Sequence, residues 1–158
     1  MCIKAFARMT MLTKYVGVPK EDLLNIYMLY IRSLLEYCSV VWHSTITGEQ
    51  SQNIERVQKL CLKVILGDEY EGYESALESC ELLTLSDRRE NKCLQFGLKC
   101  LLHPVHSQMF PVNPHANAHN TRSAEHFTVN WAKAASYCTS TVPYIQRMLN
   151  ECVINQQK

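Results

Sequence analysis

The chain has 158 residues, with 16 Lys+Arg against 15 Asp+Glu and a formal net charge of +1. Its hydrophobic share of 47% and charged share of 20% are typical of a globular protein and exclude a disordered polyelectrolyte. This length fits a single domain. Because the overall charge is nearly neutral, only a local basic face could indicate a nucleic-acid partner.

The chain contains eight cysteines, and none of them forms a Cys-x-x-Cys pair. Several stand at apolar positions of helical patterns, where a free thiol behaves as a small hydrophobic side chain. Residues 1–15 lack the continuous apolar segment of a secretory signal. No run of about 18 apolar residues occurs, so no membrane-spanning helix is predicted. We therefore expect an intracellular location, in the cytoplasm or nucleus, with reduced cysteines and no membrane partner.

The first part of the chain shows helical spacing of apolar residues. A loose pattern over 2–15 ends at Gly17-Val18-Pro19. Pro19 then opens a helix that is predicted to reach about Val41. Apolar residues recur along it with a period of 3.6: Leu23, Ile26, Tyr27, Tyr30, Ile31, Leu34, Leu35 and Cys38. The width of this stripe predicts a mostly buried helix.

Two longer helices follow, and their ends can be recognised. Thr47 and Gln50 have the spacing of a capping box, and Gly67 is placed to end that helix. Its predicted buried face consists of Ile54, Val57, Cys61, Val64 and Ile65. A short helix is expected at about 73–80. Thr84 and Asp87 then predict the start of a helix that runs to about Leu102, since Pro104 prevents continuation. Its apolar residues are Leu94, Phe96, Leu98, Cys100 and Leu101.

The last third differs in character. Residues 103–142 hold five of the six histidines and lose periodicity, so they are predicted to form an irregular connection. A short C-terminal helix is predicted over 143–154, opened by Pro143. The predicted fold class is therefore all-α: a small helical bundle over 2–102, the irregular connection 103–142 and the short helix 143–154.

The sequence lacks the motifs of an enzyme. It has no Gly-rich phosphate loop, no His-Glu-x-x-His and no Gly-x-Ser-x-Gly. It also has no Asp-Asp pair, whereas a two-metal site needs closely placed carboxylates. The nearest acidic cluster, Asp68-Glu69 with Glu71, is expected to be a solvated turn. We therefore expect no catalytic residue, no cofactor and no small-molecule substrate.

A group of cysteines and histidines raises the question of a metal site. Cys93, Cys100, His103 and His106 lie within fourteen residues, and His115 and His119 follow. Zinc binds such ligands, but only His103 and His106 have the spacing of a ligand pair. The alternative places both cysteines in a helix interface and the histidines in an exposed loop. We expect this second arrangement, with no metal.

Two helices carry rows of basic residues on one face. The first row is Arg56, Lys59 and Lys63, and the second is Arg88, Lys92 and Lys99. Such rows can neutralise phosphates without reading bases. The alternative is an ordinary solvated face, because most amphipathic helices carry lysines there. The aromatic residues Tyr27, Tyr30, Tyr37 and Trp42 could form a stacking platform, but their helical spacing favours core packing.

Residues 29–42, Leu-Tyr-Ile-Arg-Ser-Leu-Leu-Glu-Tyr-Cys-Ser-Val-Val-Trp, resemble the segment after the polymerase core in non-LTR retrotransposon reverse transcriptases, with the jockey-like branch most similar. Further similarities follow in the same order and extend over nearly the whole chain. They are Ile-Glu-Arg-Val-Gln-Lys at 54–59, Ile-Leu-Gly at 65–67, the pattern from Tyr73 to Arg89, and the pattern from Tyr137 to Asn150.

This resemblance implies a place in a polymerase rather than an activity. In the family, a Tyr/Phe-Ala-Asp-Asp motif lies upstream of this region, and nothing in the chain matches it. The matched region is the thumb and post-thumb part, which packs on the template–primer duplex. The implied function is non-catalytic, with weak and sequence-independent binding of an RNA or DNA duplex at most. The alternative is a protein–protein module, because a face normally packed on a polymerase palm would favour self-association or partner binding.

Overall fold

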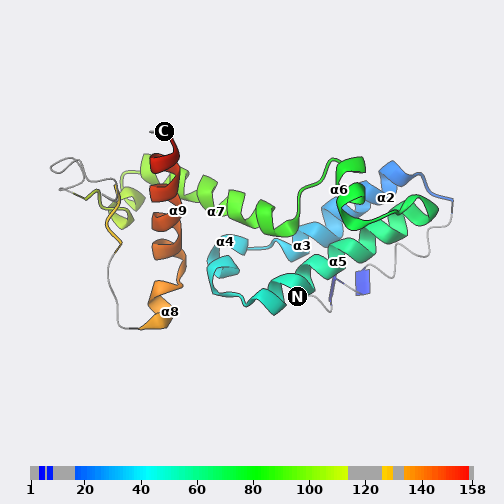
Figure 1. Ribbon diagram of the computed structural model, residues 1–158, viewed down its shortest axis with the longest axis horizontal. Helices are drawn as coiled ribbons and strands as arrows, with labels where there is room; N and C mark the ends of the chain where they lie inside the picture. Colours follow the sequence, from blue (N-terminus) through cyan, green and yellow to red (C-terminus); the bar gives the residue numbers. More distant parts are fainter. Residues whose placement is uncertain (1–3, 6, 9–16, 114–125, 130–133, 157–158) are drawn as a thin grey trace. The chain divides into compact units, whose positions relative to one another are not determined.

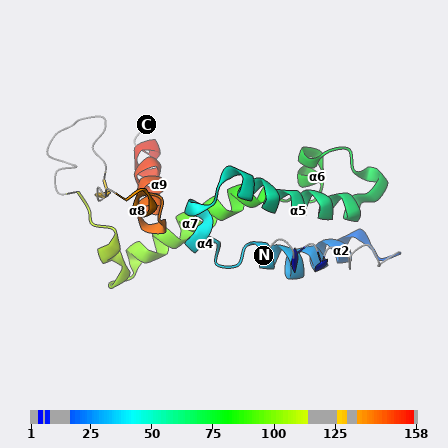
Figure 2. The same ribbon diagram turned by 90° about the horizontal axis from the view of Figure 1, so that it is seen from below.

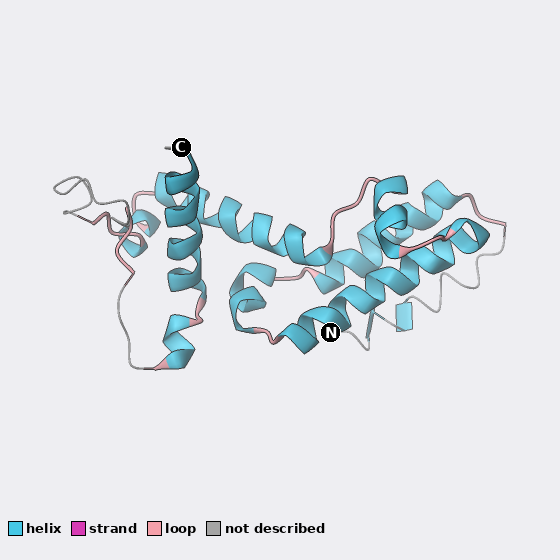
Figure 3. Ribbon diagram, in the orientation of Figure 1, coloured by secondary structure: helices cyan, strands magenta, loops and turns pink. Residues whose placement is uncertain are grey.

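The computed structural model describes residues 4–5, 7–8, 17–113, 126–129 and 134–156 (Figure 1). Within these ranges the chain is mostly helical, with an isolated β-bridge and no sheet (Figure 3). The all-α prediction is confirmed for this part of the protein. None of its helices combines the length and hydropathy needed to cross a membrane.

The chain forms two compact units. The first unit consists of Met1–Ser39 and Ile46–Arg89, and the second of Val40–Thr45 and Glu90–Lys158. The predicted bundle over 2–102 therefore contains residues of both. Helix α7 (Leu85–Leu102) begins in the first unit and ends in the second, so one helix contributes residues to both units.

In the first unit, the helix predicted from Pro19 to Val41 is broken. It consists of α2 (Lys20–Ile26), a π-helical stretch η1 (Tyr27–Arg32) and α3 (Ser33–Leu35). It stops at Glu36, and Cys38 has a positive φ of 50° before α4 (Ser39–Trp42) starts. The prediction of one helix to Val41 was wrong at this turn.

The buried face of this broken helix is narrower than predicted. Leu23, Tyr27, Ile31 and Leu35 are buried at a spacing of four residues. In an α-helix such a spacing drifts around the axis, since one turn takes 3.6 residues. The wider turns of the π stretch counter that drift and keep the four side chains on one face.

Helix α5 (Gly48–Leu66) has the predicted ends. The Thr47 hydroxyl accepts from Gln50 N at 3.2 Å, and the Gln50 side chain accepts from Thr47 N at 3.0 Å. Gly67 ends the helix with φ 54°, a conformation that favours glycine. The helix buries Ile54, Val57, Gln58, Cys61, Leu62 and Ile65. Figure 2 shows α5 running alongside α2.

After α5 come η3 (Gly67–Glu69) and α6 (Tyr73–Ser79), which matches the predicted short helix closely. Tyr73, Ala76 and Leu77 of α6 pack with Leu62 of α5 in one apolar cluster. The chain then reaches Thr84, whose hydroxyl accepts from Asp87 N at 3.1 Å, as predicted for the start of α7.

In the second unit, α7 packs against α9 (Thr141–Gln156), which is longer than the helix predicted over 143–154. Cys93 and Cys100 of α7 and Ile145 and Leu149 of α9 belong to one buried cluster. Gly97 lies at this contact. A Cβ atom there would come within 2.5 Å of Ile145 Cγ2, so a larger residue would force the neighbouring atoms to shift.

Within the described residues, the predicted irregular connection 103–142 includes regular structure. It contains η4 (His106–Met109) and α8 (Ala135–Cys138), and an antiparallel bridge joins Val112 to Phe127. Phe110 and Phe127 are buried in the α7–α9 cluster. The connection therefore supplies core residues to the second unit.

A short segment from early in the chain completes the second unit. It comprises part of α4 and η2 (His43–Thr45). The Thr141 hydroxyl at the start of α9 interacts with the carbonyl oxygens of Val40 and Val41 at 3.2 and 3.1 Å. His43 Nε2 and the Tyr144 hydroxyl share a hydrogen bond of 3.1 Å.

Candidate nucleic-acid interface

The first basic row forms an exposed face on α5. Arg56, Lys59 and Lys63 are all exposed. With a rise of about 1.5 Å per residue, the row extends about 10 Å along the helix. Phosphates of one strand follow each other at about 3.4 Å along a duplex axis, so the row could meet two or three of them.

The Lys59 side chain of this face contacts a buried aromatic ring. Its ammonium lies over the ring of Tyr73, 4.7 Å from the ring centroid. The ring is buried, whereas the lysine is exposed. An ammonium over the face of an aromatic ring is attracted by the ring's quadrupole.

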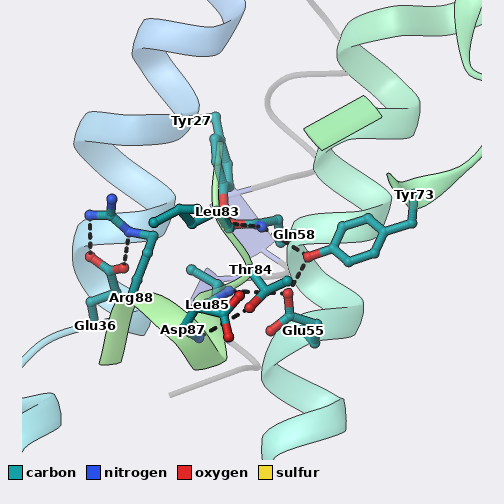
Figure 4. A network of polar contacts seen from close by, with 10 residues as sticks. All are labelled: Tyr27, Glu36, Glu55, Gln58, Tyr73, Leu83, Thr84, Leu85, Asp87 and Arg88. Carbon is teal, nitrogen blue, oxygen red and sulfur yellow. Dashed lines mark hydrogen bonds and ion pairs between the residues drawn. The ribbon is translucent and has the colours of Figure 1, made fainter. Parts of the chain in front are cut away.

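The Tyr73 ring is fixed by a buried polar network (Figure 4). The Tyr73 hydroxyl donates to Glu55 Oε1 and accepts from Gln58 Nε2 at 2.9 Å. Gln58 Nε2 also donates to the Leu83 carbonyl at 3.1 Å, and Gln58 Oε1 accepts from the Tyr27 hydroxyl at 2.5 Å. Every polar atom of the Gln58 amide is used, so the network has one defined arrangement.

Glu55 joins this network to the start of α7. Its Oε1 atom accepts from Leu85 N at 3.1 Å, while Thr84 accepts from Asp87 N at the same helix end (Figure 4). The free N–H groups of a helix N-terminus favour a carboxylate. The network therefore ties η1, α5, α6 and the first turn of α7 together within the first unit.

Burial and these hydrogen bonds shift the pKa values of several acidic groups. Burial raises the pKa of Tyr27. It also raises the pKa of Tyr73, and the hydrogen bond to Glu55 acts in the same direction. Burial raises the pKa of Cys61 to about 12. These groups stay protonated at neutral pH, so the interior of the first unit offers no nucleophile or general base from them.

The second basic row is not uniform. Arg88 is half-buried and donates to Glu36 through Nε at 2.6 Å and Nη2 at 3.2 Å (Figure 4). This hydrogen bonding raises the pKa of Arg88. The charge of Arg88 is thus balanced inside the first unit. Lys92 and Lys99 belong to the second unit, where Lys92 is half-buried and Lys99 is exposed. The α5 face is therefore the stronger candidate.

The cysteines and histidines of the suggested metal group are separated. Cys93 and Cys100 are buried in the apolar cluster of the second unit. His103 and His106 are exposed, and their rings stack with centroids 4.3 Å apart. His115 and His119 lie outside the described residues. Within the described residues, no three His, Cys, Asp or Glu side chains come together to hold a metal ion.

The aromatic residues do not act as one group. Tyr27 is buried and belongs to the polar network, as expected for a core residue. Tyr30 and Tyr37 are 60% and 69% exposed, so core packing was the wrong expectation for them. Trp42 is half-buried.

Sequence reasoning missed the buried polar residues. Gln58, Arg89 and Glu36 are buried, and Arg89 Nη2 donates to Ser51 Oγ at 2.7 Å. A signal existed for Gln58, because it stands four residues after Ile54 on the apolar face of α5. No comparable local signal marks Glu36, whose partner Arg88 is 52 residues away.

Comparisons of the chain with protein-family models, with curated proteins and with solved structures found no match.

Proposed function

We propose that the chain is a non-catalytic segment of a non-LTR retrotransposon reverse transcriptase, from its thumb and post-thumb region, which contacts a nucleic-acid duplex through the α5 basic face. The ordered similarities along the sequence support the family. The observation that carries the binding role is the joint exposure of Arg56, Lys59 and Lys63 on one face of α5.

The chemistry of this face supports a particular kind of binding. Lysine and arginine side chains neutralise phosphates, and binding releases counterions. Three charges and an overall charge of +1 provide little long-range attraction. We therefore expect dissociation constants on the order of 10⁻⁴–10⁻⁶ M and no sequence preference.

Fluorescence anisotropy on a labelled RNA–DNA duplex tests this proposal. Two or three neutralised phosphates should weaken binding by about 12- to 40-fold between 50 and 200 mM salt. Lys59→Glu/Lys63→Glu should abolish binding at low salt. The control Lys4→Glu/Lys20→Glu makes the same change in net charge outside both rows and should retain most of the affinity. Equal affinity of the two double variants, or no binding by the native chain at high micromolar concentration, contradicts the proposal.

The absence of catalysis has its own test. We expect the purified chain to extend no primer with Mg²⁺ or Mn²⁺, because the sequence offers no closely placed pair of aspartates. Nucleotide incorporation that disappears on chelation would refute this part of the proposal.

A protein–protein module is the second candidate function. The observation that favours it lies in the second unit, where Leu98, Leu102 and Val105 are 48%, 86% and 64% exposed. Leu98 and Leu102 are one turn apart on α7. Analytical ultracentrifugation in moderate salt tests this candidate: self-association should be lost in Leu102→Glu and kept in Leu83→Glu, which changes an exposed leucine of the first unit. A monomer at all concentrations removes the support for a dimer.

A further inference from the structure

We infer that Tyr73 is a positioning residue for Lys59, holding its ammonium at a defined place on the α5 basic face. This inference rests on the proposed function, since it assigns the position of one phosphate-binding charge. It adds a buried, uncharged residue to a site that sequence reasoning described only by its exposed charges.

The Tyr73 ring is a rigid support. Tyr73 is the first residue of α6, is 9% exposed, and packs with Leu62 and Leu77. Its hydroxyl is held from two sides, by Glu55 and by Gln58. Both partners belong to α5, the helix that also carries Lys59. The Tyr73 ring is therefore held in a fixed position relative to the backbone of Lys59.

Lys59 gains order from this support. A lysine side chain on a helix surface samples many rotamers, and binding a phosphate costs it that freedom. With its ammonium 4.7 Å from the ring centroid, Lys59 is held by an attraction that uses the ring face. The ammonium has three N–H donors, and those turned away from the ring remain available to phosphate oxygens.

The opposite effect would arise if the ring that holds the ammonium competed with phosphate. The two effects differ in sign. Removing the ring weakens phosphate binding if the ring positions the ammonium, and strengthens it if the ring competes with phosphate. Exposure of Lys59 favours the first, since the side chain remains accessible while it contacts the ring.

The test combines duplex affinity with NMR of the Lys59 side chain. Tyr73→Phe keeps the ring and should bind the RNA–DNA duplex within about twofold of the native chain. Tyr73→Leu removes the ring and should bind about two- to fivefold more weakly at 50 mM salt. The matched control Tyr70→Leu removes a partly buried tyrosine of the same apolar cluster and should leave affinity unchanged.

A double substitution separates positioning from general structure. In a Lys59→Met background, Tyr73→Leu should cause no further loss of affinity. The ε-CH₂ protons of Lys59 should be shifted upfield by the ring in the native chain and in Tyr73→Phe, and should lose that shift in Tyr73→Leu. The native measurement needs no variant, so it holds even where Tyr73→Leu fails to fold.

Three results overturn the inference: unshifted Lys59 protons in the native chain, tighter binding by Tyr73→Leu, or an equal loss of affinity in the Lys59→Met background. Failure of the proposed function gives a different result. In that case the native chain does not bind the duplex at 50 mM salt, whatever the Lys59 resonances show, and the positioning role falls with it.

Discussion

The side-chain amide of Asn150 makes both backbone hydrogen bonds of Phe127. Phe127 N donates to Asn150 Oδ1 at 2.7 Å, and Asn150 Nδ2 donates to the Phe127 carbonyl at 3.0 Å. Both residues are buried. The side chain of Asn150 thus satisfies the N–H and the carbonyl of Phe127, which the bridge between Val112 and Phe127 leaves without a partner. These bonds attach the segment around Phe127 to α9.

Asn150→Asp should destabilise the second unit by about 3 kcal/mol, because the carboxylate offers no donor to the Phe127 carbonyl and places a buried charge beside it. Urea denaturation followed by circular dichroism measures this change. Asn91→Asp, at an exposed position of α7, is the matched control and should change stability by less than about 0.5 kcal/mol. Equal effects of the two substitutions would show that the Asn150 amide does not hold Phe127.

Gly97→Ala should destabilise the α7–α9 contact by about 1–3 kcal/mol. The added Cβ would meet Ile145 Cγ2 at 2.5 Å, and Ile145 is fully buried, so it has little room to move. Alanine favours a helix over glycine by about 1 kcal/mol, but the clash outweighs that gain. Gly48→Ala in the first turn of α5 meets no atom within 4 Å and should be neutral or slightly stabilising. Thermal denaturation of both variants decides the matter, and a stabilised Gly97→Ala chain would contradict the close packing.

Tyr27→Phe should cost the first unit about 1–3 kcal/mol, because it removes the hydroxyl that donates to Gln58 Oε1 in a buried network. Tyr30→Phe, on the same helix but 60% exposed, should have almost no effect. Chemical denaturation of both variants gives the comparison. A neutral Tyr27→Phe would indicate that the network contributes little to stability.

Alkaline pH should weaken the first unit. The folded-state pKa of Cys61 is about 12, above its ordinary value of 9.0, and the pKa of Tyr27 is raised above 10.0. The folded chain therefore binds more protons than the unfolded chain at high pH. Stability is fully present below about pH 9 and falls as pH rises from 9 towards 12, by up to about 1.4 kcal/mol per pH unit for each group.

Denaturation midpoints between pH 7 and pH 11 measure this dependence. Tyr27→Phe should flatten the decline above pH 10, whereas Tyr30→Phe should follow the native curve. A native midpoint that stays constant up to pH 11 would contradict the burial of these groups.

Helix ends were predictable because their signals are local. The capping box of Thr47 and Gln50, the glycine at 67 and the hydroxyl of Thr84 act within three or four residues of themselves, and each stands where the sequence predicted it. The turn at Glu36–Cys38 was not predictable in this way. At this turn Glu36 pairs with Arg88, which is distant in sequence, and a cysteine has a positive φ; local spacing signals neither.

The candidate interface was predictable only in part. The spacing of Arg56, Lys59 and Lys63 predicted one exposed face, and all three are exposed. The same reasoning grouped Arg88 with Lys92 and Lys99, but helical spacing cannot detect a partner on another helix, and Glu36 is such a partner. Tyr73 could not be found from spacing, because it contacts Lys59 from α6.

The segment Val40–Thr45 lies early in the sequence but belongs to the second unit, and this affects the order in which the protein can fold during its synthesis. Val40 and His43 leave the ribosome about a hundred residues before Thr141 and Tyr144, the side chains that hold them. Since domains form from the N-terminus during synthesis and long-range contacts form slowly, this early segment must wait for α9. In a nascent chain stalled before residue 141, the first unit could form all of its own contacts. The second unit would lack α9 and could not close its core. A chaperone or protease that acts during translation would therefore encounter the second unit in an incomplete state.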